Sequence, residues 1–471
     1  MSFHDSHASR PFCALVTIAL LLSLAGRGAL QAQEQPSQTP DMQQMQKRVE
    51  RLEKELQDLK QQMTAAAELS KQAVPGPSIE VSTDTRQAEE RSEQAKPSSS
   101  INLYGFAMLD SGYNFGTVSP NWFDTERPTQ LPAFAGEFGP SGSTFWGVRQ
   151  TRFGVKSFTP TSVGDLKTIF EFELFGTGVD AGQTTFRLRH AWGELGHFGA
   201  GQTWSPFMDI DVFPNSLEYW GPNGMVFFRN VQVRWTPIQG ASNVVIALER
   251  PGASADQGVY SDRVELQNIA PQFKWPDLSG HARLAREWGY VQVGAIVRKI
   301  AWVDTSKTSP FNLSGTAIGW GVNVSSNVNF TKNDIGRFQV VYGHAIENYM
   351  NDAPVDIGAQ HNPTNPITPV KGVGLPVLGV VAFLDHNWSE RFSTSVGYSL
   401  VNIDNSNAQN QSDFHQGHYA LGNLLFHPVK QVTMGGEFQW GRRVNFTDGF
   451  NYNDYKMQFS FRYDWNKGFE F

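Results

Sequence analysis

Cysteine is nearly absent from this sequence of 471 residues, in which Cys13 is the only one. The chain also lacks an excess of positive charge, since its formal net charge is -7 at pH 7, and no nucleic-acid partner is therefore expected. Charged residues make up only 18% of the chain, which is below the usual share of about a quarter. Beyond residue 32 there is no run of about 18 apolar residues, which argues against a transmembrane helix there.

The N-terminal segment has the layout of a secretory signal peptide. Arg10 precedes an apolar run over residues 11–26, and residues 30–32 (LQA) offer a small residue for cleavage. A membrane anchor is the alternative, but the apolar run is short for a span. We therefore expect a signal peptide over residues 1–32. Because Cys13 lies within it, the mature chain has no cysteine, and no disulfide supports its fold.

The segment after the leader predicts an α-helical coiled coil over residues 33–70. Its apolar residues alternate spacings of three and four, as the a and d positions of a heptad repeat do. The predicted core residues are Met45, Val49, Leu52, Leu56, Leu59 and Met63. Charges at the flanking e and g positions favour parallel self-association, and both a dimer and a trimer fit the pattern. The alternative is a single amphipathic helix packed on the following domain.

The composition changes twice after this segment. Residues 71–100 are rich in Pro, Ser, Glu and Gln, so we expect a flexible, solvated linker. From residue 101 to residue 471 apolar and polar residues alternate with period two, as in β-strands with one apolar face. The expected strands cover residues 102–113, 147–157, 166–175, 184–194, 199–207, 226–236, 242–250, 264–274, 278–287, 290–302, 316–329, 336–347, 376–387, 391–403, 416–427, 431–442 and the terminal segment. If residues 264–287 form one strand, the total is sixteen.

The connections between these strands alternate between short and long. Such alternation is typical of an even-stranded, up-and-down barrel in a membrane, with tight turns on one side and long loops on the other. A soluble β-sandwich has the same period, but one sandwich core rarely extends over so many residues. Tryptophans near the expected strand ends, including Trp192 and Trp302, suggest the aromatic girdles of a membrane barrel. We therefore predict an all-β transmembrane barrel of sixteen antiparallel strands over residues 101–471.

The end of the chain supports this prediction. From Met457 nearly every second residue is aromatic, and the chain stops at Phe471. An exposed strand of this kind is an aggregation hazard in a soluble protein, whereas in a barrel it can face lipid. Phe471 is the expected C-terminal assembly signal. The partners expected on this basis are the barrel-insertion machinery and the lipid and lipopolysaccharide of a Gram-negative outer membrane.

Several segments resemble the DcaP-like trimeric outer-membrane porins. They are GQTWSPFMDIDVFPNSLEYWGPNGMVFFRNVQVRWTP (residues 201–237), FRLRHAWGELG (186–196) and INLYGFAMLDSGYNF (101–115). The order of leader, heptads, linker and barrel is also similar. The resemblance implies a homotrimer of sixteen-stranded barrels, a periplasmic coiled coil, and uptake of small, often anionic or dicarboxylic solutes.

A pore needs a constriction whose side chains select by charge. In similar porins the third long loop folds into the lumen, which here would bring in Asp209, Asp211 and Glu218, although a plain surface or subunit-contact loop is the alternative. The basic residues that we expect on the inner wall are Arg152, Lys156, Arg187, Arg189, Arg234 and either Arg298 or Lys299. For Arg187 and Arg189 the alternative is cross-strand pairing with Glu171 and Glu173 on the neighbouring strand.

These features predict a passive channel for small polar solutes with a preference for anions such as dicarboxylates. The alternative is an envelope tether, in which the barrel anchors a coiled coil that contacts the cell wall. An enzyme is not expected, because no serine stands in a nucleophile motif such as GxSxG. The histidines are scattered without the spacing of a zinc site, so we expect neither a metal nor a cofactor.

Overall fold

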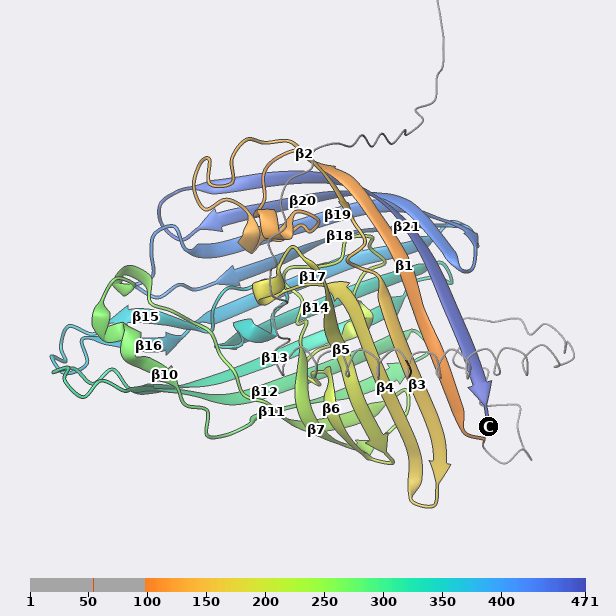
Figure 1. Ribbon diagram of the computed structural model, residues 1–471, viewed down its shortest axis with the longest axis horizontal. Coiled ribbons are helices and arrows are strands. Elements are labelled where there is room, and N and C mark those ends of the chain that lie inside the picture. Colours follow the sequence, from red (N-terminus) through yellow and green to blue (C-terminus); the bar gives the residue numbers. More distant parts are fainter. Residues whose placement is uncertain (1–53, 55–97) are drawn as a thin grey trace, which may run out of the picture. The chain divides into compact units, whose positions relative to one another are not determined.

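The computed structural model describes Lys54 and residues 98–471, and residues 100–470 form a closed antiparallel β-barrel (Figure 1). Its wall contains sixteen strands, two of which are interrupted and carry two labels each. In chain order the wall segments are β1 (Ser100–Asn114), β2 (Ser143–Gly147), β3 (Arg152–Thr161), β4 (Gly164–Phe175), β5 (Thr184–Leu195), β6 (Phe198–Trp204), β7 (Arg229–Ile238), β8 (Asn243–Glu249), β10 (Ile269–Pro271), β11 (Asp277–Arg286), β12 (Gly289–Asp304), β13 (Gly315–Asn329), β14 (Asp334–His344), β17 (Pro376–Asn387), β18 (Phe392–Ile403), β19 (Phe414–Val429), β20 (Val432–Asn445) and β21 (Asn451–Glu470).

The first and last strands close the barrel, and Figure 1 shows β1 and β21 side by side. Their register runs from Ser100 opposite Glu470 to Asn114 opposite Lys456. β2 and β3 both pair with β1 and are consecutive parts of one strand, as β10 and β11 are along β12. The predicted total of sixteen and the merging of residues 264–287 into one strand are therefore confirmed. The first residues of that segment, Val264–Asn268, form a short 3₁₀ helix (η6) instead.

The connections differ in length between the two ends of the barrel, which confirms the predicted alternation. At one end, here called the turn end, they cover residues 162–163, 196–197, 239–242, 287–288, 330–333, 388–391 and 430–431. At the opposite loop end they cover residues 115–142, 176–183, 205–228, 250–268, 305–314, 345–375, 404–413 and 446–450. The loop end also carries a small sheet of β9 (Ala255–Asp256), β15 (Ile357–His361) and β16 (Val370–Gly374). The remaining 3₁₀ turns are η1 (Pro120–Trp122), η2 (Pro128–Gln130), η3 (Gly178–Asp180), η4 (Ile210–Val212), η5 (Gly258–Tyr260) and η7 (Glu347–Tyr349).

The outer face of the wall is apolar. On β14, for example, Phe338, Val340 and Tyr342 are exposed, whereas Gln339 and Val341 between them are buried. Closure of the sheet pairs the backbone groups of every wall strand, so an apolar exterior can face hydrocarbon without leaving polar backbone groups unpaired. Among the residues that the structure describes, no helix is long and apolar enough to cross a membrane.

Two tryptophans depart from the predicted girdle. The pairing of β4 with β5 contains a register shift, so the successive residues Arg189 and His190 are both buried. As a result Trp192 faces the interior, where its Nε1 donates to Glu194. On β12 every second residue from Tyr290 to Ile300 is buried, and Trp302 continues this series, so it also points inward. The alternation of residue types could not reveal the bulge, because one extra residue reverses the parity of all that follow.

One side of the interior is filled by an apolar core. Phe207 and Met225 of the 205–228 loop pack with Ile346 of the 345–375 loop and with wall residues such as Val381 and Val401. The inner face of the wall between β12 and β19 is thus partly apolar, which differs from the expected polar lining. Space for solute is left mainly along the other side of the barrel.

The predicted leader, the coiled coil with its core residues Met45 to Met63, and nearly all of the linker lie outside the described residues, so they stay predictions. Phe471 is described at the end of the closing strand, where it is exposed and its N–H donates to the Ser99 carbonyl at 2.8 Å. Its role as an assembly signal also stays a prediction.

Replacing Val340 by Arg should test the assignment of the outer face. Its side chain lies midway along the exposed face of β14, so a buried guanidinium there should reduce the free energy of unfolding from phospholipid bilayers by about 2–4 kcal/mol. His344→Arg, at the loop end of the same face, should cost only about 0–1 kcal/mol. Equal costs in urea titrations of the two variants would argue against a lipid-facing surface.

Candidate functional site

The connection between β6 and β7, residues 205–228, lies across the interior of the barrel. Asp209 accepts a hydrogen bond from Ser325 of β13 at 2.6 Å. Farther along the loop, the Leu217 N–H donates to Glu437 of β20 at 2.7 Å. These partners belong to well-separated strands, so the loop extends over a large part of the inner wall.

Glycines in the GPNG segment of this loop permit its close approach to the wall. Gly221 has a φ of +79°, a conformation that residues with a side chain rarely adopt. At Gly224 a Cβ atom would lie 2.0 Å from the Leu400 carbonyl oxygen, and the Gly224 N–H donates to Ser399 Oγ at 2.9 Å. The loop backbone therefore packs directly on β18, where no larger residue fits.

The three acidic residues expected at the constriction all lie on this loop inside the barrel, but they differ in exposure. Asp209 is 1% exposed and Glu218 is 2% exposed, whereas the side chain of Asp211 is 48% exposed. Arg283 of β11 bridges both aspartates, at 2.6 Å from Asp209 and 2.5 Å from Asp211. Burial raises the pKa of Asp209, and it raises the pKa of Glu218 to about 7 even though the Gly221 N–H donates to Glu218. Only Asp211 of the three thus presents much of its carboxylate to water.

Three of the predicted wall cations, Arg152, Arg187 and Arg189, form one ionic cluster with Glu171 and Glu173. The Arg189 guanidinium lies 2.6 Å from both Glu171 and Glu173. Arg152 lies 3.3 Å and Arg187 3.7 Å from Glu173. The cross-strand pairing that sequence analysis weighed as an alternative for Arg187 and Arg189 is therefore present. Exposure within the cluster is unequal, because the side chains of Arg187 and Arg152 are 28% and 25% exposed and that of Glu173 is 0% exposed.

Two further predicted cations face the interior nearer the turn end. Arg234 of β7 donates to the carbonyl of Trp204 at 2.5 Å and to Gln232 at 3.0 Å. Lys156 of β3 is exposed, and its Nζ lies 4.9 Å from the centre of the Tyr104 ring. Neither cation lies close enough to a carboxylate to form an ion pair within the described part of the chain, so both can act on a passing anion.

Arg298 occupies a different setting. Its side chain is 0% exposed and forms salt bridges with Asp277 at 3.1 Å and Asp356 at 2.9 Å. It also donates to the carbonyl of Gly252, so it attaches two loops of the loop end to β12. Lys299, the alternative at this position, is exposed on the opposite face of the strand. Neither Arg298 nor Lys299 therefore lines either compartment described below, in contrast to the prediction.

The first of two open compartments lies toward the loop end and has a volume of about 310 Å³. Arg127 and Arg187 are its charged lining residues, and the described residues that line it include no acid. The Arg127 guanidinium lies 4.1 Å from the Trp122 ring and 3.9 Å from the Trp220 ring. Its counterion, Asp352, lies 2.8 Å away but is fully buried. The compartment thus presents positive charge between aromatic walls.

The second compartment opens toward the turn end and has a volume of about 440 Å³. Its lining includes both signs of charge. The cations are Lys167, Arg234 and Arg283, and the acids are Glu194, Asp209 and Asp211. This compartment is therefore close to balanced, unlike the first.

An aromatic pair lies between the two compartments. Trp204 lines the second compartment and Phe227 lines the first, and their ring centres are 5.1 Å apart in an edge-to-face arrangement. Arg229 lies behind this pair, with its guanidinium 4.7 Å from the Trp204 ring. The linings of the two compartments therefore come close to each other at this pair.

Sequence analysis did not identify Arg127, Trp204, Phe227 or Arg283. Arg283 stands in HARLAR with the alternation used for the other wall cations, so the same criterion could have found it. Arg127 lies in an irregular loop of 115–142, where no periodicity indicates its direction. No group of three or more potential metal-binding side chains occurs in the described part of the chain.

A closed sixteen-stranded barrel with an internal loop and charged compartments defines an outer-membrane protein with a porin-like channel fold. The chain belongs to the DcaP outer membrane protein family, whose model matches residues 42–464.

Two solved structures show the likeness of fold. The outer membrane channel DcaP of Acinetobacter baumannii is 18% identical, with 79% of this chain and 99% of that chain covered and a TM-score of 0.63. The anion-selective porin from Comamonas acidovorans is 10% identical, with 78% and 100% covered and a TM-score of 0.50. No curated protein matches the sequence.

Titration of Glu218 should make stability depend on pH. Its pKa is about 7 in the folded protein against 4.5 ordinarily, so the folded protein binds the proton more tightly than the unfolded chain does. This contribution to the free energy of unfolding should be full below pH 4.5 and should decrease by about 3 kcal/mol up to pH 7.

The measurement is thermal unfolding of detergent-solubilised protein between pH 4 and 8, with Glu218→Gln as the comparison. The difference between the native chain and the variant isolates this group from other titrating carboxylates. If the two chains show the same pH dependence, Glu218 is not the group responsible.

Proposed function

We propose that this protein is a passive channel for small polar solutes with a preference for anions such as dicarboxylates. The observation that carries the proposal is the loop-end compartment, whose charged lining residues are Arg127 and Arg187 while their carboxylate partners are buried behind them. An exposed guanidinium can come into contact with a passing ion, whereas the buried carboxylates stay farther away, so the two arginines should attract anions.

The cations continue along the inner wall. Arg152 and Arg187 are partly exposed in the ionic cluster, and Lys156 and Arg234 face the interior nearer the turn end. A guanidinium binds a carboxylate through two parallel hydrogen bonds, and two guanidinium groups in the loop-end compartment suit a solute with a carboxylate at each end. Arg189 supports this surface from behind, since its side chain is 5% exposed between both glutamates.

The loop of residues 205–228 is the proposed constriction. Asp211 is the acidic residue of this loop that reaches water, and it lies beside Arg283. The buried Asp209 and Glu218 would then hold the loop in position rather than contact solute. One protein of similar fold, the porin from Comamonas acidovorans, is anion-selective, which agrees with the proposed preference.

Arg187→Gln should reduce anion preference. This change removes a partly exposed charge from the loop-end compartment, whereas Glu173 keeps its bonds to Arg189 and Arg152, so the fold should persist. In planar bilayers under a tenfold KCl gradient, the reversal potential should move toward zero. Arg286→Gln is the matched control, because Arg286 is an exposed residue at the turn end.

A smaller shift is expected for Arg234→Gln, because the compartment that it lines also contains acids. Reversal potentials that stay at the native value in Arg187→Gln, with unchanged conductance, would overturn the assignment of this arginine.

We also propose a homotrimer, with the barrel in the outer membrane and the coiled coil of residues 33–70 in the periplasm. The support is the heptad pattern together with the family resemblance. Deleting residues 42–70 should lower the yield or thermal stability of the trimer on native gels and leave the conductance of each barrel unchanged. A conductance that disappears in correctly inserted barrels would show that the coil has a role in transport itself.

A further inference from the structure

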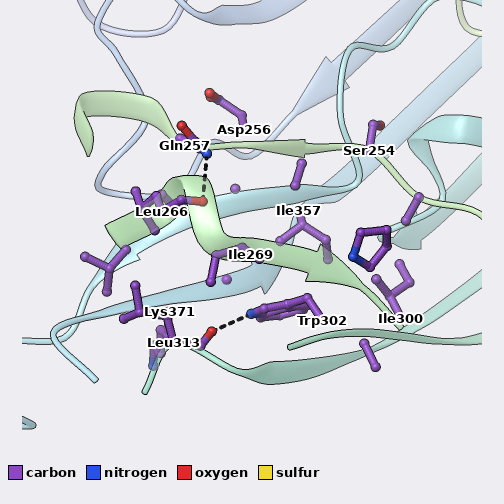
Figure 2. A pocket seen from close by; sticks show the side chains of 18 of the residues that line it. Ser254, Asp256, Gln257, Leu266, Ile269, Ile300, Trp302, Leu313, Ile357 and Lys371 are labelled. Atoms are coloured by element: carbon purple, nitrogen blue, oxygen red, sulfur yellow. Dashed lines mark hydrogen bonds between the residues drawn. The ribbon is translucent and has the colours of Figure 1, made fainter. Parts of the chain in front are cut away.

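The rim of the barrel at the loop end differs from one part of the wall to another. Beside β10 and β12, the small sheet of β9, β15 and β16 packs against the wall, and an apolar cavity of about 260 Å³ lies between them (Figure 2). Beside β18 to β21 the connections are shorter and cover residues 404–413 and 446–450. These four strands are paired in order and lie side by side in Figure 1.

The alternation along β19 and β20 fixes which of their side chains point outward. On β19, Tyr419 is buried and donates to Glu218 of the internal loop at 3.3 Å, so its neighbour His418 points out of the barrel. On β20, Arg443 is also buried, so its neighbour Arg442 points outward. His418 and Arg442 are directly opposite each other in the pairing of these strands. The two side chains therefore share the outer face.

Polar side chains surround this pair on the outer face. The group is here called the polar rim patch and consists of Asn402, Gln416, His418, Arg442, Asn451 and Asn453. Gln416 donates to Asn402 at 3.1 Å, and its oxygen lies 3.0 Å from Nε2 of His418. Nδ1 of His418 lies 2.6 Å from the Tyr398 hydroxyl. Both ring nitrogens of the histidine are thus engaged within the protein.

An aromatic row borders the patch toward the middle of the wall. Tyr398, Trp440 and Tyr455 lie in line across β18, β20 and β21, with Ala420 of β19 between the first two. Trp440 Nε1 donates to the Asn453 side-chain oxygen at 3.1 Å. Trp and Tyr concentrate where the hydrocarbon of a membrane meets the lipid head groups. The polar rim patch is therefore at the level of the head groups.

Arg442 is the charged group that the patch leaves without a counterion. Its guanidinium donates to Asn451 at 3.5 Å and forms no ion pair within the described part of the chain. In the loop-end half of the described wall strands, none of the outward positions is acidic. The wall of a second copy of this chain therefore offers no carboxylate to Arg442, whereas phospholipid head groups at this level offer phosphate.

We propose that the polar rim patch binds the phosphate group of a membrane lipid on Arg442, with the acyl chains of the lipid on the apolar outer face beyond the aromatic row. A guanidinium and a phosphate form strong, charge-assisted hydrogen bonds. Asn453 accepts from Trp440 through its oxygen, so its amide nitrogen can donate to the same phosphate. Exposed Leu424 and Phe438 provide apolar surface for the chains. The site does not depend on the proposed transport function.

Native mass spectrometry of the delipidated full chain in a nonionic detergent tests the proposal. The probes are dimyristoyl phosphatidic acid and dimyristoylglycerol, which has the same acyl chains without the phosphate. The first phosphatidic acid should bind about tenfold more tightly than the diacylglycerol, because only its phosphate bonds to the guanidinium. Inorganic phosphate at an equal concentration should not displace the lipid, since it has no chains to bury.

Arg442→Gln should weaken the binding of phosphatidic acid by about tenfold and leave that of the diacylglycerol unchanged. Arg442→Lys keeps the charge and should retain most of the affinity. Lys299→Gln is the matched control, because Lys299 is an exposed outward cation of β12 whose cross-strand partner, Ile318, is apolar. This control should bind both lipids as the native chain does. The heat-dependent shift on SDS gels checks the folding of each variant.

Equal affinities for the two lipids, or equal losses in Arg442→Gln and Lys299→Gln, would overturn the site. Displacement of the lipid by an equal concentration of inorganic phosphate would overturn the lipid as its occupant. If Arg442→Gln dissociates the oligomer and leaves lipid affinity unchanged, the patch is a contact between copies and the proposal is wrong. If this variant fails to fold, the preference between the two lipids in the native and Arg442→Lys chains still decides the question.

Discussion

The hydrogen-bonded pairing of β1 with β21 is the interaction on which the rest of the structure depends. A sheet in hydrocarbon cannot leave an open edge, because each unpaired N–H or C=O there lacks the water that would otherwise solvate it. The pairing extends over the whole of β1, from Ser100 to Asn114, and joins the first strand of the chain to the last. It provides closure to residues 98–471, which contain no cysteine and therefore no disulfide. Only a closed wall can then enclose a loop such as 205–228.

Inside this wall, the basic and acidic side chains of an ion pair differ in how far they are exposed to water. Glu173 is fully buried and has Arg189, Arg152 and Arg187 within salt-bridge distance, while two of these arginines remain partly exposed. Arg127 and the fully buried Asp352 repeat the arrangement in the lining of the loop-end compartment. The buried carboxylates hold the guanidinium groups in place, and in the proposed channel a solute would meet the guanidinium side of each pair. A chain with a net charge of -7 can in this way present a positive surface locally.

The sequence predicts the wall well and the interior poorly. Period-two alternation and the alternation of loop lengths are local properties that a barrel imposes along the whole chain, and they were sufficient for sixteen strands. The inward direction of Trp192 depends on a bulge, and the burial of Arg298 depends on Asp356 from a distant loop. Neither is visible in local spacing. The partners of a lumen-facing charge are set by which loops enter the barrel, and this information is not contained in the alternation.

The asymmetry of the interior explains why inner-face composition alone does not locate a channel. Between β12 and β19 the inward residues include Val381 and Val401, which pack on Phe207 and Met225 of the internal loop. This apolar core adds to the polar contacts that position the loop, since apolar packing contributes with every buried contact. The loop is therefore anchored on one side, and the compartments lined by Arg187 and Arg234 remain on the other. Packing on one side of the barrel thus leaves charges of the opposite wall to line the two compartments.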